Sequence, residues 1–560
     1  MRALPMSPVA RQMLDRVPMA LLTAGLLVLY LGMPYRSVDS DAATFGIMGN
    51  DLLRYHHLPT LAIGQDYLFS LTPYVYALLR LLLPRLSAPV LYALAGSVLS
   101  LGGLWLIYES LLRVQRREGQ PTLGSGAVFC LLVAASPTFV FELSVNSGLE
   151  VAVFLLGVTL FAASSCGPGA RAWRTYGVLG AAISFAAYSR PQIAMYGCVA
   201  LIPLLRREQR FKSSLVGLGA GLFVGYAPML FHKCRLLIGH PWPFTHHLQM
   251  AVGTGDQVSR SLGMLAHVIV PGTFSIRTDY PIYSAFAWVF MLVALGLAVV
   301  AVRRRPVNAW DAGWAYGSLL VLILMLLNPW LSYASAQRRY CIQVVLAAAW
   351  FAARYSHRRF LLRHAFLGVA AILCALSLPM WRDSLASKWQ DEQNARKTVN
   401  ELVPVLARHG GVFLTDYWDA YRLSFLADGA LTVEAFPWDL VRTYGWVTAE
   451  QLRARTAWLI KSGYTGAARD HLRESCGDDI LKKLKTTNIN VRFFGRDCEL
   501  WELPDPEAAV HMMEHHHPDY FRTPYPPGSG RLTPRLASPL NSLSEPGIDS
   551  EPGVNTDHLR

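Results

Sequence analysis

The sequence is poor in charge and lacks the short cysteine motifs of zinc and redox sites. Only 16% of its 560 residues are charged and 53% are hydrophobic, whereas a soluble domain has more charge and fewer apolar residues. Its eight cysteines include no CxxC pair, so neither a zinc nor a thiol-redox reading has support. No internal repeat of the kind found in many transporters is visible. These shortages indicate an integral membrane protein.

Basic residues exceed acidic ones, with a net charge of +13, but they are concentrated in short loops between apolar runs. With the N-terminus inside, the six inner segments hold 19 Lys and Arg among 65 residues, and the five outer loops hold 11 among 127. Positive charge is therefore enriched inside, as membrane topology requires. Because topology accounts for the charge, no nucleic-acid partner is expected.

Eleven apolar runs predict about 11 transmembrane helices, although several are shorter than the roughly 20 residues of a simple span. The runs cover residues 17–34, 88–112, 123–141, 148–164, 176–188, 193–205, 214–231, 283–302, 312–327, 341–353 and 365–379. The first run has no convincing cleavage site after it and is expected to be a retained span. Since the number of spans is odd, the chain after Pro379 is expected outside the cytoplasm.

The predicted fold is an α-helical polytopic membrane protein with a C-terminal soluble α/β domain. Residues 1–380 form the transmembrane domain, which includes an outer acidic loop at 35–87, and residues 381–505 form an extracytoplasmic domain. In the latter, helical stretches alternate with β-like runs. The helices are expected near 391–408 and 421–426, and the strands near 410–418, 431–435, 457–461, 489–493 and 499–503. Residues 506–560 are predicted to be a disordered tail.

The acidic loop begins with Asp39 and Asp41, directly after the first span. Charges are costly there unless they face water or a lined cavity, so both are candidate functional residues. Apolar residues from Ala42 to Leu53 recur at helical spacing and predict an amphipathic helix on the membrane surface. One carboxylate could accept a proton from an acceptor hydroxyl or amine, or orient it. The alternative is that Ser40 or Asp41 caps the helix, which is worth about 1 kcal/mol.

One cap explains only one of these two acids, so the pair favours catalysis over capping alone. A divalent cation held by Asp39 and Asp41 is a weaker alternative, because hard cations prefer carboxylates but no other ligands are visible. No other cofactor is expected.

The stretches DSDAATFGIMGNDLL and GQDYLFSL resemble the first outer loop of bacterial polytopic glycosyltransferases of the GT-C superfamily. These are relatives of the protein O-mannosyltransferases and the lipid A aminoarabinose transferases. DYWDAYRLSFLADG is similar to their outer C-terminal domain, so the resemblance spans residues 38 to about 505. The family's Asp-Glu pair falls on Asp41 and Ala42, and Asp39 is the expected substitute for the missing acid. Which of the two aspartates leads stays open.

The resemblance also places Gln65, Asp66 and Tyr67 near the sugar site. All three side chains can hydrogen-bond sugar hydroxyls. The alternative is that this GQD sequence is only a turn followed by a helix cap.

Arg338, Arg339 and Tyr340 match an Arg-Tyr signature that the family places at the outer head of a span. The planar fork of an arginine can bind the phosphate of a lipid-linked donor with two hydrogen bonds. Arg190, in a short outer turn, is a further candidate for the same role. The alternative for these arginines is an interfacial anchor or an exposed turn.

The predicted function is transfer of a sugar from a polyprenyl-phosphate donor to an extracytoplasmic acceptor, which is a glycan, lipid or protein. The expected location is the bacterial inner membrane, in the service of the cell envelope. A lipid-linked saccharide transporter or flippase is a rival, but few charges lie in mid-span. A non-catalytic subunit of a polysaccharide assembly complex is a second rival, because Ala42 replaces the family's Glu.

Overall fold

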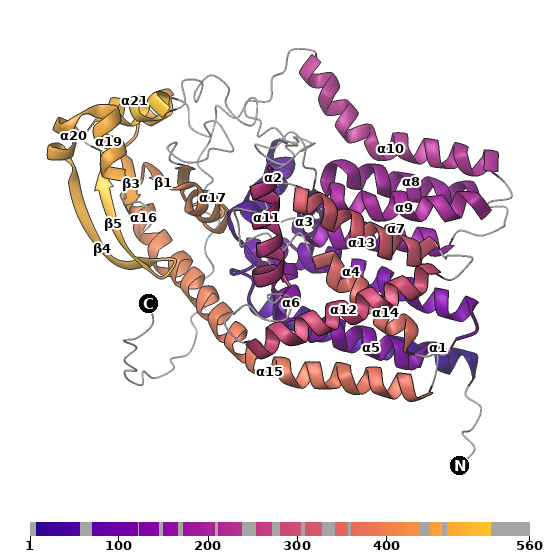
Figure 1. Ribbon diagram of the computed structural model, residues 1–560. Helices are drawn as coiled ribbons and strands as arrows, with labels where there is room; N and C mark the ends of the chain where they lie inside the picture. The colour runs from indigo at the N-terminus through magenta and orange to yellow at the C-terminus, as the bar shows by residue number, and fades with distance from the viewer. Residues whose placement is uncertain are drawn as a thin grey trace.

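The computed structural model has two parts, a large helical bundle and a smaller sheet domain, joined by one long helix (Figure 1). It describes residues 7–55, 70–120, 122–144, 149–165, 172–207, 211–237, 254–270, 281–303, 309–327, 342–356, 360–435, 449–461, 468–503 and 505–516.

Every predicted apolar run falls on a helix of the bundle or, for residues 123–141, on a pair of helices. The pair is α5 (Leu123–Ala134) and α6 (Pro137–Ser144), which are bent by 78° at their junction. Pro137 explains the break, because it lacks a backbone donor and clashes with the preceding turn of a continuing helix. The other helices are α1 (Pro8–Gly32), α4 (Ala88–Arg117), α7 (Leu149–Ser165), α8 (Ala172–Ser189), α9 (Pro191–Arg207), α10 (Phe211–Leu237), α12 (Pro281–Arg303), α13 (Ala309–Leu327), α14 (Ile342–Tyr355) and α15 (Phe360–Lys397).

By length and composition, four helical stretches of the described chain could each cross a membrane, or five if the bent pair counts as one span. The four are Gln12–Gly32, Ala88–Arg117, Phe211–Phe231 and Leu367–His409. Leu149–Ser165, Pro191–Arg206, Ala287–Arg303 and Ala309–Leu324 are apolar but shorter. The chain is thus a multi-pass membrane protein, and a total of eleven spans stays a prediction.

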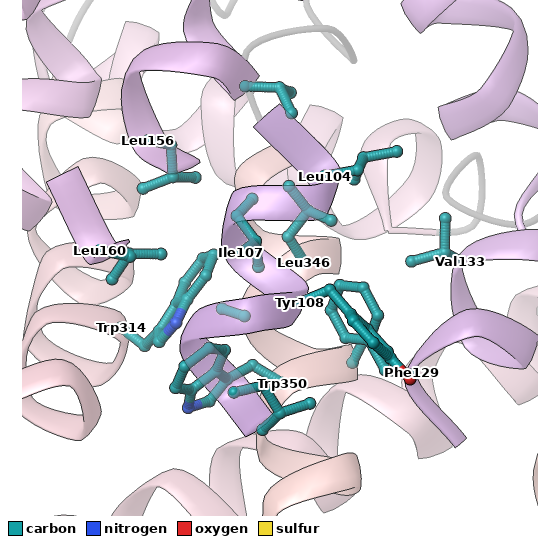
Figure 2. Packing of buried hydrophobic residues seen from close by; sticks show 14 of the residues in the cluster. Leu104, Ile107, Tyr108, Phe129, Val133, Leu156, Leu160, Trp314, Leu346 and Trp350 are labelled. Carbon is teal, nitrogen blue, oxygen red and sulfur yellow. The ribbon is translucent and has the colours of Figure 1, made fainter. Parts of the chain in front are cut away.

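The core of the bundle forms where α4 meets α7 at two glycines. A β-carbon on Gly103 would lie 2.5 Å from the Val153 carbonyl oxygen, and one on Gly157 would lie 2.5 Å from the Gly103 carbonyl oxygen. Only glycine permits so close an approach of two backbones. The side chains packed around this contact come from α4, α5, α7, α13 and α14, and Figure 2 labels Leu104, Ile107, Tyr108, Phe129, Val133, Leu156, Leu160, Trp314, Leu346 and Trp350.

One end of the bundle is closed by a group of polar side chains, here called the inner cluster: Asp15, Glu118, Thr122, Asp311 and Arg354. Arg354 Nε donates to Asp311 Oδ1 at 3.2 Å, and its guanidinium also pairs with Glu118. Thr122 Oγ1 donates to Asp15 Oδ2 at 2.6 Å. All five residues belong to segments predicted to face inside, so their meeting supports the predicted alternation of the helices.

The helix predicted after Asp41 is present as α2 (Ser40–Tyr55), and α3 (Thr72–Leu82) follows it. The first half of α2 is enclosed on all sides, since Ala42, Phe45 and Met48 are at most 2% exposed. It packs against α3 and against α17 (Tyr417–Leu426) of the sheet domain. The expectation of a helix lying on the membrane surface is therefore wrong for this half, because protein covers both of its faces.

Helix α15 continues unbroken past Pro379, and a π-helical turn, η5 (Thr398–Leu402), leads it into α16 (Val403–His409). The span predicted at 365–379 and the helix predicted at 391–408 are thus one rod (Figure 1). The expected boundary at 380/381 falls inside it. The amino-acid composition changes at this boundary because α15 leaves the apolar bundle there and continues toward the sheet domain.

The turn between α1 and α2 is fastened to this rod. Glu392 of α15 is buried, and its carboxylate accepts the backbone N–H of Arg36 at 2.8 Å and Nε of Arg396 at 2.6 Å. The Arg36 guanidinium lies 5.0 Å from the centre of the Phe141 ring. Burial lowers the pKa of Arg36 to about 10, against the opposing effect of nearby carboxylates. This anchorage fixes the chain just before Asp39.

The sheet domain has five strands in the order β2-β1-β3-β5-β4. They are β1 (Val412–Thr415), β2 (Thr432–Ala435), β3 (Ala457–Lys461), β4 (Lys485–Phe493) and β5 (Arg496–Glu502). Strands β2, β1 and β3 are parallel, whereas β5 runs antiparallel to β3 and β4. Each strand overlaps one of the predicted β-like runs. The apolar residues of one face join those of α2 and α17 in a single core.

The opposite face of the sheet is covered by helices near the end of the described chain. Asp505 begins α21 (Pro506–His516), with its carboxylate accepting the Glu507 backbone N–H at 3.0 Å. Val510 and Met513 of α21 are buried against the sheet. The prediction of a disordered tail from 506 onward is therefore wrong for residues 506–516. The remaining short helices are α11 (Gly255–Met264), η1 (Leu265–Ile269), α18 (Ala449–Arg453), α19 (Ala468–Cys476) and α20 (Asp478–Lys483).

Candidate active site

Asp39 caps helix α2. Its Oδ1 accepts the backbone N–H of Ala42 at 2.7 Å, and its carbonyl oxygen accepts that of Ala43 at 2.8 Å. A side-chain oxygen that satisfies one of the orphan N–H groups of the first turn is the defining contact of an N-cap. The alternative that Ser40 or Asp41 provides the cap is therefore wrong, because that position belongs to Asp39.

Asp41 lies in the first turn of α2, half-buried. The positive end of the helix dipole favours a negative charge here. Its backbone carbonyl accepts the Thr44 hydroxyl at 2.7 Å. Because Asp39 makes the cap, the cap does not account for the Asp41 carboxylate. The two acids thus differ in their surroundings, and Asp41 is the better candidate for chemistry.

A third carboxylate, Glu150, joins them from the start of α7. Glu150 is fully buried, and its Oε1 accepts the hydroxyl of Thr72 at 2.5 Å. The buried Tyr92 of α4 lies within electrostatic range of Glu150, Asp39 and Asp41. The three acids therefore share one phenol as an electrostatic neighbour. Asp39, Asp41, Tyr92 and Glu150 are called the outer acidic site below.

Sequence reasoning missed Glu150, because it was taken as part of the span predicted at 148–164. A signal was present, since an ionisable residue at the outer end of an apolar run is a functional candidate by default. Its partner Thr72 opens α3 and is itself hydrogen-bonded to Ser70, with Oγ to Oγ1 at 3.1 Å.

The sheet domain closes over α2 through α17, which carries the second family-like stretch. A β-carbon on Gly46 would lie 2.3 Å from Cε2 of Phe425, so the two helices touch where α2 has no side chain. The Phe425 ring packs edge-on against Tyr76 and Tyr92, with centroids 5.7 and 5.6 Å apart. Tyr92 therefore links the acids to α17. The stretches DSDAATFGIMGNDLL and DYWDAYRLSFLADG, which both carry the resemblance, therefore meet in space.

Arg190 connects α8 to α9 and is half-buried. Its backbone N–H donates to the Ala186 carbonyl at 2.7 Å. The nearby Tyr188 packs in a small cluster with Leu71 and Tyr74 at the start of α3. Since α3 also supplies Thr72 to Glu150, the turn that holds Arg190 lies at the same end of the bundle as the outer acidic site.

The remaining predicted site residues lie outside the described residues: Gln65, Asp66 and Tyr67 in 56–69, and Arg338, Arg339 and Tyr340 in 328–341. Among the residues that are described, no group of three or more His, Cys, Asp or Glu side chains is placed to hold a metal ion. A divalent cation at Asp39 and Asp41 stays a prediction.

Asp51 lies ten residues after Asp41 on α2, which is about 15 Å along the helix at 1.5 Å per residue. Its Oδ2 atom is buried and has no hydrogen-bond partner in the structure. Burial raises the pKa of Asp51 to about 7, and the positive charge of Arg54 opposes this shift. The group therefore titrates near neutral pH. In the sequence it was only one of the polar residues of an amphipathic helix.

In sequence, the chain matches no family model and no curated protein. In structure, it is similar to ArnT from Cupriavidus metallidurans bound to undecaprenyl phosphate, with a TM-score of 0.55 and 12% identity, over 85% of this chain and 97% of ArnT. For the apo state of ArnT the TM-score is 0.51 and the identity 14%, over 85% of this chain and 98% of ArnT.

ArnT is a lipid A aminoarabinose transferase, and its fold is of the GT-C type. At these identities the likeness is one of fold. The predicted GT-C-type fold is thereby confirmed.

Proposed function

We propose that the protein transfers a sugar from a polyprenyl-phosphate donor to an acceptor at the outer face of a bacterial inner membrane. The fold is shared with ArnT, a structure of which holds undecaprenyl phosphate. The observation that carries the proposal is the position of Asp41. It is half-buried at the start of α2, within electrostatic range of Tyr92, while the cap of the helix is provided by Asp39.

The reaction is an inverting displacement at the anomeric carbon of the sugar. An acceptor hydroxyl or amine attacks this carbon, and its proton passes to the Asp41 carboxylate as general base. The bond between the anomeric carbon and the phosphate oxygen breaks, and polyprenyl phosphate leaves with the electron pair. Glu150 accepts the Thr72 hydroxyl and thereby fixes the start of α3 to the start of α7.

Binding roles are assigned by chemistry. Arginine forks suit the donor phosphate, and amide, carboxylate and phenol groups suit sugar and acceptor hydroxyls. We assign Arg190, Arg338 and Arg339 to the phosphate and Gln65, Asp66, Tyr67 and Tyr340 to the sugar and acceptor. Should a divalent cation at Asp39 and Asp41 assist, a chelator will abolish turnover and added metal will restore it.

The decisive test is Asp41→Asn in the purified full-length protein. Asparagine keeps the shape but cannot take a proton, and loss of a general base typically lowers a rate by about 100-fold to 10,000-fold. Release of polyprenyl phosphate from labelled donors should fall by that factor, with normal membrane insertion.

Asp39→Asn is the matched control, because Asn and Asp cap helices about equally well. We expect it to lose less than about tenfold, since the cap survives and only a neighbouring charge is removed. Wild-type turnover in both variants and in the double variant would exclude the acidic centre. Wild-type protein that releases no polyprenyl phosphate from any donor would instead favour a flippase or an assembly subunit.

A further inference from the structure

Arg422 of α17 is a cation that the described chain leaves without a hydrogen bond at its buried Nε atom. That atom is buried and has no hydrogen-bond partner in the structure. The guanidinium lies over the Phe494 ring, with Cζ 4.1 Å from the ring centroid. The side chain as a whole is half-buried. A buried N–H group that makes no hydrogen bond is costly, so the retention of this arginine calls for an explanation.

The carboxylates around Arg422 are engaged elsewhere. Burial lowers the pKa of Arg422, and the charges of Asp419, Asp39 and Asp391 act in the opposite direction. Asp419 forms an ion pair with Arg496, and Asp39 caps α2. Asp391 pairs with Lys388 at 3.5 Å. The Arg422 guanidinium thus lies within electrostatic range of Asp39 in the outer acidic site. The Asp39 carboxylate, however, is already hydrogen-bonded to the backbone of α2.

The location decides which substrate such a cation can serve. In an inverting displacement, the nucleophile and the leaving phosphate lie on opposite sides of the anomeric carbon. A group beside the proposed base therefore faces the acceptor. Helix α17 of the sheet domain packs against α2, and Arg422 on α17 lies within electrostatic range of Asp39 at the start of α2. The lipid donor, by contrast, must enter from the bundle.

We propose that Arg422 binds an oxyanion group, phosphate or carboxylate, on the acceptor substrate. A planar guanidinium can hold either group with two parallel hydrogen bonds. The cation also offsets the repulsion that Asp39, Asp41 and Glu150 exert on an anionic acceptor. This inference rests on the proposed function, and it narrows the acceptor to a negatively charged glycan, lipid or protein segment.

The first experiment measures anion binding by the purified full-length protein, with inorganic phosphate and succinate as probes, and requires no turnover. Wild type should bind at least one probe saturably at pH 7. Arg422→Met should abolish this binding, and Arg422→Lys should weaken it at least tenfold, because Lys lacks the planar fork. Arg453→Ala, which removes an exposed cation paired with Glu507, is the control and should bind like wild type.

The melting temperature of Arg422→Met serves as the control for correct folding. Met keeps apolar volume over Phe494 and removes a charge that has no partner at Nε, so Arg422→Met should melt at or above the wild-type temperature. A merely structural Arg422 predicts a lower melting temperature. Absence of saturable binding to either probe in wild type, or unchanged binding in Arg422→Met, overturns the proposal.

A second experiment separates acceptor from donor by titrating undecaprenyl phosphate. Equal affinity in wild type and Arg422→Met supports the acceptor assignment, whereas loss of affinity assigns Arg422 to the donor and overturns it. Because neither titration requires catalysis, a failure of the proposed function, seen as no Asp41-dependent turnover, is distinguishable from a failure of this inference.

Discussion

The two ends of the bundle both bury charge, but they treat it differently. In the inner cluster Arg354 pairs with Asp311 and Glu118, while Oδ1 of Asp15 is buried without a hydrogen bond among the described residues. At the other end of the bundle the Arg422 guanidinium lies over the Phe494 ring, and its Nε and Oδ2 of Asp51 are buried without a hydrogen bond among the described residues. A buried cation that is paired with carboxylates holds helices in place, whereas a buried polar atom without a hydrogen bond calls for an explanation, such as strain, a water, an ion or a ligand. We infer from this contrast that Arg354 and its partners hold the bundle together, whereas Arg422 is available to a ligand.

The largest effect on stability is expected from breaking the inner cluster. Arg354→Ala leaves Asp311 buried beside an empty position, and removal of one partner of a buried pair costs about 3–5 kcal/mol. The apparent melting temperature in detergent should fall far more than in Arg453→Ala, since the exposed Arg453–Glu507 pair is screened by water and contributes little. Equal melting of the two variants would show that the inner cluster does not hold the helices.

An intermediate effect is expected where the sheet domain meets α2. In Gly46→Ala the new methyl group collides with Phe425, which cannot yield because Tyr76 and Tyr92 enclose it. Overpacking of this kind costs about 1–3 kcal/mol. Transfer activity should fall as well, because α17 is displaced from the outer acidic site.

The matched control is Gly25→Ala on α1, where nothing lies within 4 Å of the new β-carbon. That variant should be neutral or more stable by up to about 1 kcal/mol, as helix propensity predicts. Phe425→Leu should partly rescue Gly46→Ala. A rescue of stability without activity would mean that the ring itself, through Tyr92, matters to the site.

Local patterns predicted the elements well. Apolar runs located the bundle helices because a lipid-facing helix must be apolar along its length, and the β-branched, aromatic runs near 412 and 457 became β1 and β3. Where two signals conflicted, the prediction failed. Residues 506–516 lie beside His and Pro clusters typical of a tail, yet Asp505-Pro506 is a helix start, and Val510 and Met513 form an apolar face.

The site was predicted only in part, because its geometry depends on contacts between distant segments. The enclosure of α2 results from α17, which lies more than 350 residues later in the chain. No periodicity within 38–55 could reveal that contact. The missing acid at Ala42 has a structural reason, since this residue is fully buried and its N–H is bound by Asp39. Glu150, on α7, contributes a further acid to the outer acidic site.

The smallest effect is expected at Asp51. It tests whether a buried carboxylate oxygen without a hydrogen bond lowers the stability of the folded protein. Its pKa is raised to about 7 in the folded protein, from about 3.9 in an unfolded chain. Between these values the folded state retains a proton that the unfolded state has lost, so stability falls as pH rises from about 4 to 7. Asp51→Asn removes this loss. The variant should therefore gain stability relative to wild type at pH 8 and much less at pH 5.

We expect a gain on the order of 1–2 kcal/mol at pH 8, less than the full shift implies because the side chain is partly exposed. Thermal melting of both proteins at the two pH values measures it, with the exposed Asp479→Asn following wild type throughout. Parallel loss of stability in wild type and Asp51→Asn between pH 5 and 8 would mean that water or a neighbouring donor satisfies Oδ2. Asp51 would then carry no unsatisfied charge, and Arg422 alone would distinguish the outer end from the inner one.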